Sequence, residues 1–206
     1  MISQMQQVAA FVLAGGRSSR MGRDKTALVL DGKTLLQRAV EIAAAAGDRF
    51  CIIGAGESIT AAAAQLGCPV ITDVFAGQGP LAGIHAALES TYAGKLNFIL
   101  AVDIPFVTPE LVGFMVERAA ASAALVTLAE TAGMLHPLCA VYRPEFGSHA
   151  RAALAEGRNK IDKAIPAAAL NVISQAELLR LGFHPEMLAN LNTPADFAAA
   201  EVRLRR

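Results

Sequence analysis

Short apolar segments of strand length alternate with helical segments through the first 120 residues, and this alternation most strongly limits the possible folds. Each apolar run is bounded by turn residues, as buried strands are. Strands that alternate with helices form parallel sheets whose two faces the helices cover. The sequence therefore predicts an α/β protein with three layers, α/β/α, around a mostly parallel sheet.

Turn and capping residues divide the chain into the expected elements. Thr108 is a helix N-cap followed by Pro109 at the first helical position, and Gly47 stops an earlier helix. Strands are expected over residues 8–13, 50–53, 69–72, 96–102, 123–128, 135–142 and 170–173. Helices are expected over residues 34–46, 57–66, 80–90 and 144–156, and from residues 108 and 193 onward. At 206 residues, without a repeat or a low-complexity linker, the chain has the size of one ordinary domain.

The composition excludes several classes of partner. Lys+Arg and Asp+Glu balance at 18 each, so no overall field attracts a nucleic acid or a membrane surface. No run approaches the ~18 apolar residues of a membrane span, and the first residues lack the features of a signal peptide. Cys51, Cys68 and Cys139 have no metal-binding spacing, and Cys51 and Cys139 lie in apolar runs that indicate burial. We expect a soluble cytoplasmic protein.

The first expected strand, residues 8–13, runs directly into a loop rich in glycine and cationic side chains. The loop contains Gly15, Gly16, Arg17, Arg20, Gly22, Arg23 and Lys25. Glycines let backbone N–H groups approach an anion, and arginine and lysine add positive charge that suits phosphate. Because open α/β sheets bind ligands at the carboxyl ends of their strands, a polyphosphate site is favoured over a solvated connector. Five residues separate Gly16 from Gly22, and Lys25 follows three residues later, so the loop is not a P-loop.

Two aspartates follow expected strands and would lie on the same edge as the loop. Asp73 comes directly after residues 69–72, and Asp103 comes directly after residues 96–102. Either could be only a cap, but beside a phosphate loop the two suit Mg²⁺, which takes one or two carboxylates together with phosphate oxygens. Residues 77–82 match a dinucleotide-binding pattern, but they follow the third strand, where a glycine turn and a proline helix start explain them.

No obvious general base accompanies these groups. The four histidines are scattered, and neither H-E-x-x-H nor G-x-S-x-G is present. A phosphate monoester is already largely anionic at neutral pH, because its second pKa is near ~6. Its attack on the α-phosphate of a nucleoside triphosphate therefore requires charge neutralisation and alignment, and no proton removal. These residues predict nucleotidyl transfer, but they leave the base and the acceptor open.

Several motifs resemble those of one family. Leu-Ala-Gly-Gly at residues 13–16 and Arg-Met-Gly-x-Asp-Lys at residues 20–25 resemble the signature loop of nucleotidyltransferases with a dinucleotide-binding-like fold. The match is closest to the molybdenum cofactor guanylyltransferase family. Further similar segments are residues 79–83, 102–105, 136–138 and 192–196, which occur in the family's order over almost the whole chain. The resemblance implies a fold like that of nucleotide-diphospho-sugar transferases.

The resemblance also implies roles for individual residues. It makes Asp103 the Mg²⁺ ligand. The residues themselves add the hypothesis that Lys25 and Arg20 are catalytic together with Asp103, the two cations stabilising charge as pyrophosphate departs. The nucleotide-binding residues would be Leu13, Ala14, Gly15, Gly16, Lys25, Asp73, Gly79, Pro80 and Asp103. The acceptor-side residues would be His136, Arg158, Asn159, Lys160, Asn192 and Thr193. One nucleotidyltransferase domain would span residues 1–206, with a nucleotide-binding half over residues 1–110 and an acceptor-binding half over residues 111–206.

The resemblance further implies the substrates. GMP would pass from GTP to the terminal phosphate of molybdopterin, with transient contact to molybdenum-insertion proteins or molybdoenzyme chaperones. Gly15 favours guanine, because related cytidylyltransferases resemble Leu-Ala-Ala-Gly at this point. Residues 54–56, Gly-Ala-Gly, depart from the family, which usually has an asparagine after the second strand. The alternatives are a related transferase that uses CTP or another phosphorylated acceptor, and a non-catalytic nucleotide-binding module.

Overall fold

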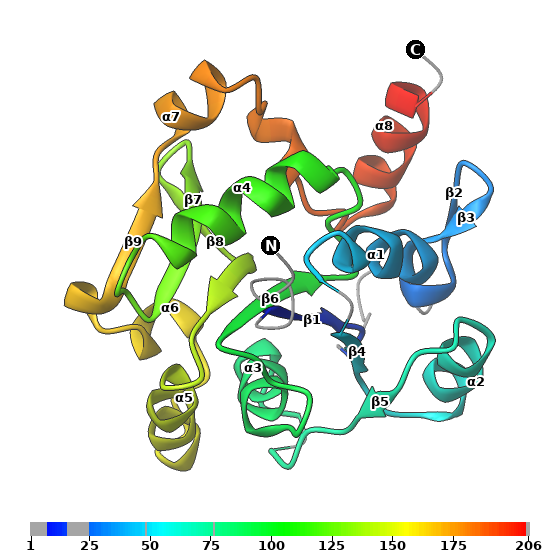
Figure 1. Ribbon diagram of the computed structural model, residues 1–206. Coiled ribbons are helices and arrows are strands. Elements are labelled where there is room, and N and C mark those ends of the chain that lie inside the picture. The colour runs from blue at the N-terminus through cyan, green and yellow to red at the C-terminus, as the bar shows by residue number, and fades with distance from the viewer. Residues whose placement is uncertain (1–7, 16–24, 48, 76, 205–206) are drawn as a thin grey trace.

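The computed structural model describes residues 8–15, 25–47, 49–75 and 77–204 (Figure 1). A seven-stranded sheet runs through this part of the chain in the order β5-β4-β1-β6-β8-β7-β9. Its strands are β1 (Val8–Leu13), β4 (Arg49–Ile53), β5 (Val70–Ile71), β6 (Leu96–Ala101), β7 (Val126–Thr131), β8 (Met134–Tyr142) and β9 (Leu170–Ile173). Because β1 lies between β4 and β6, it is a central strand, and the chain that follows it starts with a neighbouring strand on each side.

The sheet is mixed but mostly parallel, as predicted. β1 pairs in parallel with β4 and β6, β4 with β5, and β7 with β9. Among the described strands only β8 is reversed, because it is antiparallel to both β6 and β7. The register places Leu13 beside Ile53 and Ala101, so the carboxyl ends of three strands lie at one level. The pairing of Leu100 with Cys139 brings the beginning of β8 to the same edge.

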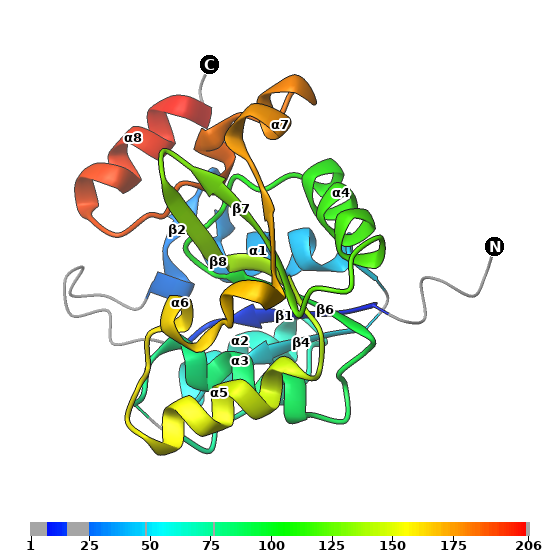
Figure 2. The same ribbon diagram turned by 90° about the vertical axis from the view of Figure 1, so that its left-hand side faces the viewer.

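Helices cover both faces of the sheet and complete the predicted three layers (Figures 1 and 2). One face carries α1 (Leu35–Ala44) and α4 (Pro109–Ala120), and the other carries α3 (Pro80–Glu89) and α5 (Phe146–Ala155). The remaining helices are α2 (Glu57–Gln65), α6 (Ile161–Ala164), α7 (Gln175–Arg180) and α8 (Pro194–Leu204). The 3-10 turns are η2 (Lys25–Ala27), η3 (Ala167–Ala169) and η4 (Pro185–Leu188).

Two apolar cores lie on opposite faces of the sheet, and alternate strand residues point into each. In β1, Ala10 and Val12 pack in the core beneath α1 and α4, whereas Phe11 and Leu13 pack in the core beneath α3 and α5. All six residues of β1 are buried. Double-sided burial explains why this strand reads as a continuous apolar run without polar alternation.

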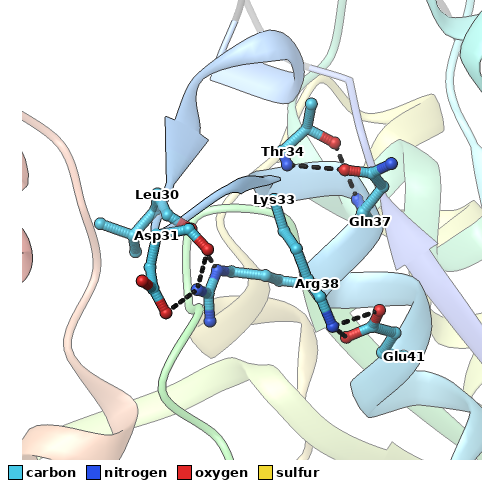
Figure 3. A network of polar contacts seen from close by, with 7 residues as sticks. All are labelled: Leu30, Asp31, Lys33, Thr34, Gln37, Arg38 and Glu41. Atoms are coloured by element: carbon cyan, nitrogen blue, oxygen red, sulfur yellow. Dashed lines mark hydrogen bonds and ion pairs between the residues drawn. The ribbon is translucent and has the colours of Figure 1, made fainter. Parts of the chain in front are cut away.

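A short hairpin anchors the chain between Lys25 and α1 (Figure 3). Its strands are β2 (Val29–Leu30) and β3 (Lys33–Thr34), which pair antiparallel. The Nε atom of Arg38 in α1 donates to the Leu30 carbonyl at 2.8 Å. Thr34 and Gln37 form a capping box at the start of α1. The backbone that follows Lys25 is therefore tied to a packed helix.

The structure corrects the sequence expectations at several elements. β7 begins at Val126, not at residue 123, because residues 121–125 still belong to the connection from α4. α5 begins at Phe146 and not at residue 144, because Pro144 lies in a turn in which the Gly147 N–H donates to the Pro144 carbonyl. The β2–β3 hairpin, α6 and α7 were not predicted, since segments this short produce no clear periodicity. All three cysteines are free and buried. Within the described ranges, no helix has the length and hydropathy of a membrane span.

Candidate nucleotide site

Backbone hydrogen bonds hold the ends of the parallel strands together where the candidate site lies. The Ala14 N–H donates to the Ile53 carbonyl at 2.9 Å, directly after β1. The Val102 N–H donates to the Leu13 carbonyl at 3.1 Å, directly after β6. These bonds extend the sheet pairing by one residue beyond the strands, so the chain segments that leave β1, β4 and β6 begin side by side.

A pocket of about 640 Å³ opens at this edge. It is lined by Leu13, Gly15, Ile53, Gly54, Ala55, Thr72, Asp73, Gly77, Gly79, Pro80 and Gly83. Five of these eleven residues are glycines, so much of the wall is backbone that a ligand can approach closely. The volume is typical of sites for small molecules of nucleotide size.

The turn before α3 depends on glycine. Gly79 has φ +76° and is the N-cap of α3, and Pro80 occupies the first helical position. A residue with a side chain would be strained at this φ. The predicted combination of a glycine turn and a proline helix start is therefore confirmed.

Lys25, Asp103 and Asn192 meet beside the end of β6, although they are far apart in the sequence. The Lys25 Nζ atom donates to Asp103 Oδ2 at 2.9 Å and to Asn192 Oδ1 at 3.0 Å. The side chains of Lys25 and Asp103 are only 18% and 15% exposed. A pair so poorly solvated is screened less than a surface ion pair. The predicted convergence of Lys25 and Asp103 on one edge is confirmed.

Asn192 is held in a turn at the start of α8. The Asp196 Oδ2 atom accepts from the N–H groups of Asn192 at 2.9 Å and Thr193 at 2.8 Å. Thr193 Oγ1 in turn accepts from the Asp196 N–H at 3.1 Å. The N–H of Asn192, followed by that of Thr193, lowers the pKa of Asp196, because both donate to its charged form. On the other side, the Leu191 N–H donates to the Asp103 carbonyl at 2.8 Å.

Two buried carboxylate oxygens at this edge have no hydrogen-bond partner among the described residues. They are Asp73 Oδ1 and Asp103 Oδ1. A buried polar atom without a partner costs free energy, so such atoms in a folded protein usually await a ligand, an ion or water. Both oxygen atoms can accept a hydrogen bond or coordinate a hard cation.

The structure brings most of the predicted nucleotide-side residues together. Leu13, Gly15, Asp73, Gly79 and Pro80 line the pocket. Ala14 is joined to β4 by its N–H, and Lys25 and Asp103 pair beside β6. The predicted residues Gly16 and Arg20, like Arg17 and Arg23, lie outside the described residues.

The predicted acceptor-side residues are not brought together to the same degree. His136 lies in β8 near the site edge, where its Nε2 atom is 2.6 Å from Thr131 Oγ1. Burial lowers the pKa of His136, which favours the neutral imidazole. Arg158 forms an exposed ion pair with Glu156 at 2.6 Å, and Lys160 is exposed before α6. Of this set, Asn192 is the residue that contacts Lys25.

Sequence reasoning missed Asp196, Gly54, Ala55 and Thr72. Asp196 carried a detectable signal, because Thr-Pro-Ala-Asp at residues 193–196 has the spacing of a helix cap with an acid in the first turn. Gly54 and Ala55 were noted only as a departure from the family's usual asparagine, and Thr72 carried no signal, because small residues after a strand end are common in any α/β protein. Their place in the pocket follows only from the alignment of β4 and β5 beside β1.

The fold and this edge define a class of protein, the α/β enzymes that bind a nucleotide and transfer part of it. The MobA-like NTP transferase domain family matches residues 10–169. The chain belongs to this family and is a nucleotidyltransferase.

Relatives match over nearly the full length. A "Probable molybdenum cofactor guanylyltransferase" from Pelotomaculum thermopropionicum is 31% identical, and the match covers 96% of this chain and 94% of the relative. A protein of the same description from Carboxydothermus hydrogenoformans is 32% identical, with 94% of each chain covered.

Solved structures show the same fold. The molybdopterin-guanine dinucleotide biosynthesis protein A from Archaeoglobus fulgidus has a TM-score of 0.82 at 24% identity, with 96% of this chain and 98% of that chain covered. The CMP:2-keto-3-deoxy-manno-octonic acid synthetase has a TM-score of 0.72 at 12% identity, with 97% and 98% covered. At these identities the similarity supports the fold and not the substrates.

Proposed function

We propose that the protein is a molybdenum cofactor guanylyltransferase, which transfers GMP from GTP to the terminal phosphate of molybdopterin and releases pyrophosphate. The observation that carries the proposal is the pairing of Lys25 and Asp103 beside a glycine-lined pocket at the carboxyl edge of the sheet. The names of the relatives supply the guanine and the molybdenum cofactor.

The nucleoside would occupy the pocket between β1, β4 and α3. Gly15 and Gly79 leave the backbone open to the base and ribose, and the free Oδ1 of Asp73 offers an acceptor there. A carboxylate oxygen can accept from the N1–H and amino groups of guanine, whereas adenine presents no donor at N1. This arrangement is compatible with GTP, and the choice of guanine over the other bases rests on the names of the relatives.

Asp103 would hold Mg²⁺, with the triphosphate completing the ion's coordination. Its buried Oδ1 atom has no partner among the described residues, and a carboxylate is the ligand type that Mg²⁺ takes, so the site fits the ion. When bound, Mg²⁺ would neutralise charge on the reacting phosphates.

Lys25 would carry the protein's own share of that neutralisation. Its side chain is mostly buried and its ammonium group lies within hydrogen-bond distance of Asp103, so it is positioned before the phosphates arrive. Positioned charge is effective in catalysis because it does not have to reorganise as the reaction proceeds. Arg20 would add a second positive charge as pyrophosphate departs.

The acceptor would approach from the side of β8 and α8. A terminal phosphate is anionic near neutral pH, so alignment with the α-phosphate is sufficient for attack without a general base. We assign the nucleotide to residues 1–110 and the acceptor to residues 111–206 of a single domain, with His136, Arg158 and Lys160 on the acceptor side. A cytoplasmic location and hand-off to molybdenum-insertion proteins or molybdoenzyme chaperones fit a labile product.

A single set of assays tests the proposal. Purified protein with Mg²⁺ is incubated with each of the four nucleoside triphosphates, with and without molybdopterin, and pyrophosphate is measured. We expect release only with GTP and molybdopterin together. Release with CTP in place of GTP would reassign the base, and GTP binding without any transfer would point to a non-catalytic module.

A further inference from the structure

The position of the Lys25 ammonium depends on its two acceptors. A lysine side chain has several rotatable bonds and loses much conformational freedom when it is fixed. In this structure Asp103 Oδ2 and Asn192 Oδ1 hold it, at 2.9 Å and 3.0 Å. One acceptor is the Asp103 carboxylate, which a divalent cation would also engage. The other is the neutral amide oxygen of Asn192, which attracts a hard cation less strongly than a carboxylate does.

Asn192 itself is fixed from two sides. Its N–H, and that of Thr193, donate to Asp196 Oδ2, and the preceding N–H of Leu191 donates to the Asp103 carbonyl. The turn therefore spans the gap between the end of β6 and the start of α8. Its amide oxygen reaches Lys25 across 167 positions of sequence. These bonds fix the backbone of the turn, from which the exposed side-chain amide of Asn192 extends to Lys25.

Two roles for Asn192 lead to different expectations. If it binds the acceptor, its removal leaves nucleotide binding unchanged as long as no acceptor is present. If it acts through Lys25, its removal weakens nucleotide binding without any acceptor. The contact with Lys25 at 3.0 Å favours the second role.

We propose that Asn192 is a positioning residue for Lys25, and that Asp196 fixes the turn that makes this possible. The proposal rests on the proposed function, in which Lys25 binds the triphosphate. When Asp103 engages a cation, Asn192 keeps the Lys25 ammonium group beside the end of β6. The ammonium group can then exchange its bond to the carboxylate for a bond to the phosphates while it stays in the site.

A double-mutant cycle tests this role through binding alone. The affinity for GTP with Mg²⁺, in the absence of molybdopterin, is measured by calorimetry for wild type, Asn192→Ala, Lys25→Met and the double variant. Because hydrogen bonds to charged groups are the stronger ones, we expect Asn192→Ala to bind GTP about tenfold more weakly. In the Lys25→Met background the same substitution should have no further effect, because coupled residues are non-additive.

Asp196→Ala should weaken GTP binding in the same direction, and a matched variant separates this effect from loss of a helix cap. Ser174 caps α7 through the Glu177 N–H at 3.2 Å, away from the site, so Ser174→Ala removes a cap without touching Asn192. We expect Ser174→Ala to bind GTP like wild type, with thermal melts recorded for every variant. A folded Asp196→Ala variant with wild-type affinity would overturn the role of Asp196.

The remaining outcomes are also decisive. Wild-type affinity in Asn192→Ala, or equal losses with and without Lys25, would overturn the role of Asn192 and leave the proposed function intact. A wild-type protein that binds none of the four nucleoside triphosphates would overturn the proposed function, and the role of Asn192 with it.

Discussion

The two halves of the sheet edge differ in how their candidate residues are brought together. On the side of β1, β4, β5 and β6, parallel strands end at one level, and the residues that follow them line one pocket or lie directly beside it. On the side of β8, β7 and β9, the candidates lie on three separate segments. His136 is on the reversed strand β8, Arg158 and Lys160 are in the turn between α5 and α6, and Asn192 precedes α8. His136 bonds to Thr131 and Arg158 to Glu156, and only Asn192 reaches Lys25.

The difference shows what parallel pairing does for a site. Consecutive parallel strands deliver their carboxyl ends to the same edge, so short loops converge without any further device. A reversed strand and a C-terminal helix must be placed by tertiary contacts, such as the bonds from the Leu191 N–H to the Asp103 carbonyl and from Lys25 to Asn192. We therefore expect single substitutions in the proposed nucleotide half to reduce turnover and substrate affinity more than single substitutions in the proposed acceptor half.

The largest effect is expected at the ion pair of Lys25 and Asp103, which lies in the proposed nucleotide-binding half. Asp103→Ala and Lys25→Ala should each reduce the rate of pyrophosphate release at least 100-fold, the scale seen when one positioned charge is removed from a transition state. The steady-state assay with GTP and molybdopterin measures this, and circular dichroism confirms folding. Release within a few-fold of wild type in either variant would remove that residue from the reaction.

Replacing Gly15 by alanine tests whether the nucleotide approaches this residue, because the added methyl group should affect binding and not stability. A Cβ atom on Gly15 would meet no atom of the described residues within 4 Å, so Gly15→Ala should leave the free energy of unfolding within about 0.5 kcal/mol of wild type. Because Gly15 lines the pocket, the new methyl group should raise the KM for GTP roughly tenfold by displacing the nucleotide.

Gly113 in α4 is the matched control for Gly15. Its Cβ would also meet nothing within 4 Å in the part of the chain that the structure describes, but Gly113 lies in α4, in a helix layer that covers the sheet. Gly113→Ala should raise the free energy of unfolding by about 1 kcal/mol and leave the KM for GTP unchanged. Equal KM values for the two variants would show that the nucleotide does not approach Gly15.

A smaller effect is expected in the acceptor half. His136→Ala should raise the KM for molybdopterin several-fold while the affinity for GTP stays that of wild type, because His136 lies on β8 and outside the pocket lining. The loss of its bond to Thr131 should lower the free energy of unfolding by about 1 kcal/mol. A change in GTP affinity without a change in the acceptor KM would move His136 to the nucleotide side.

The smallest effect concerns stability at mildly acidic pH. His85 in α3 is buried against Phe75, and neither ring nitrogen has a partner among the described residues. Burial lowers its pKa from 6.5, partly opposed by Glu89 and aided by Arg151. The neutral form is therefore favoured in the folded protein, so its contribution to stability is present above pH 6.5 and is lost as pH falls through the lowered value.

Replacing His85 should remove this part of the pH dependence. Urea unfolding of wild type should give a lower free energy at pH 5 than at pH 7.5, and His85→Leu should show a shallower decline over that interval. The burial of His136 lowers its pKa in the same way, so some decline should remain. Identical slopes for wild type and His85→Leu would mean that His85 is protonated equally in both states.

Much of the nucleotide half was predictable because its signals are local. The run at residues 8–13, Lys25 and the aspartates at positions 73 and 103 are read from neighbouring residues, and the parallel strands bring them to one edge. The prediction for the loop over residues 16–24 stays a prediction, because these residues lie outside the described ranges. The β2–β3 hairpin and α7 escaped prediction, because a two-residue strand and a six-residue helix contain less than two periods of any pattern. The start of β7 was misplaced because alanine-rich residues 119–125 fit the end of a helix and the start of a strand equally well.

The sequence by itself determined the alternation of strands and helices, and with it the layers, the parallel direction of the first strands and the edge on which Lys25, Asp73 and Asp103 lie. These follow from the hydrophobic period and from turn residues, which act over a few positions. Only the tertiary structure decided that Asn192, supported by Asp196, contacts Lys25, and that the pocket wall includes Gly54 and Thr72. Such contacts depend on how distant segments pack against the sheet, and no local pattern encodes a hydrogen bond between residues 25 and 192.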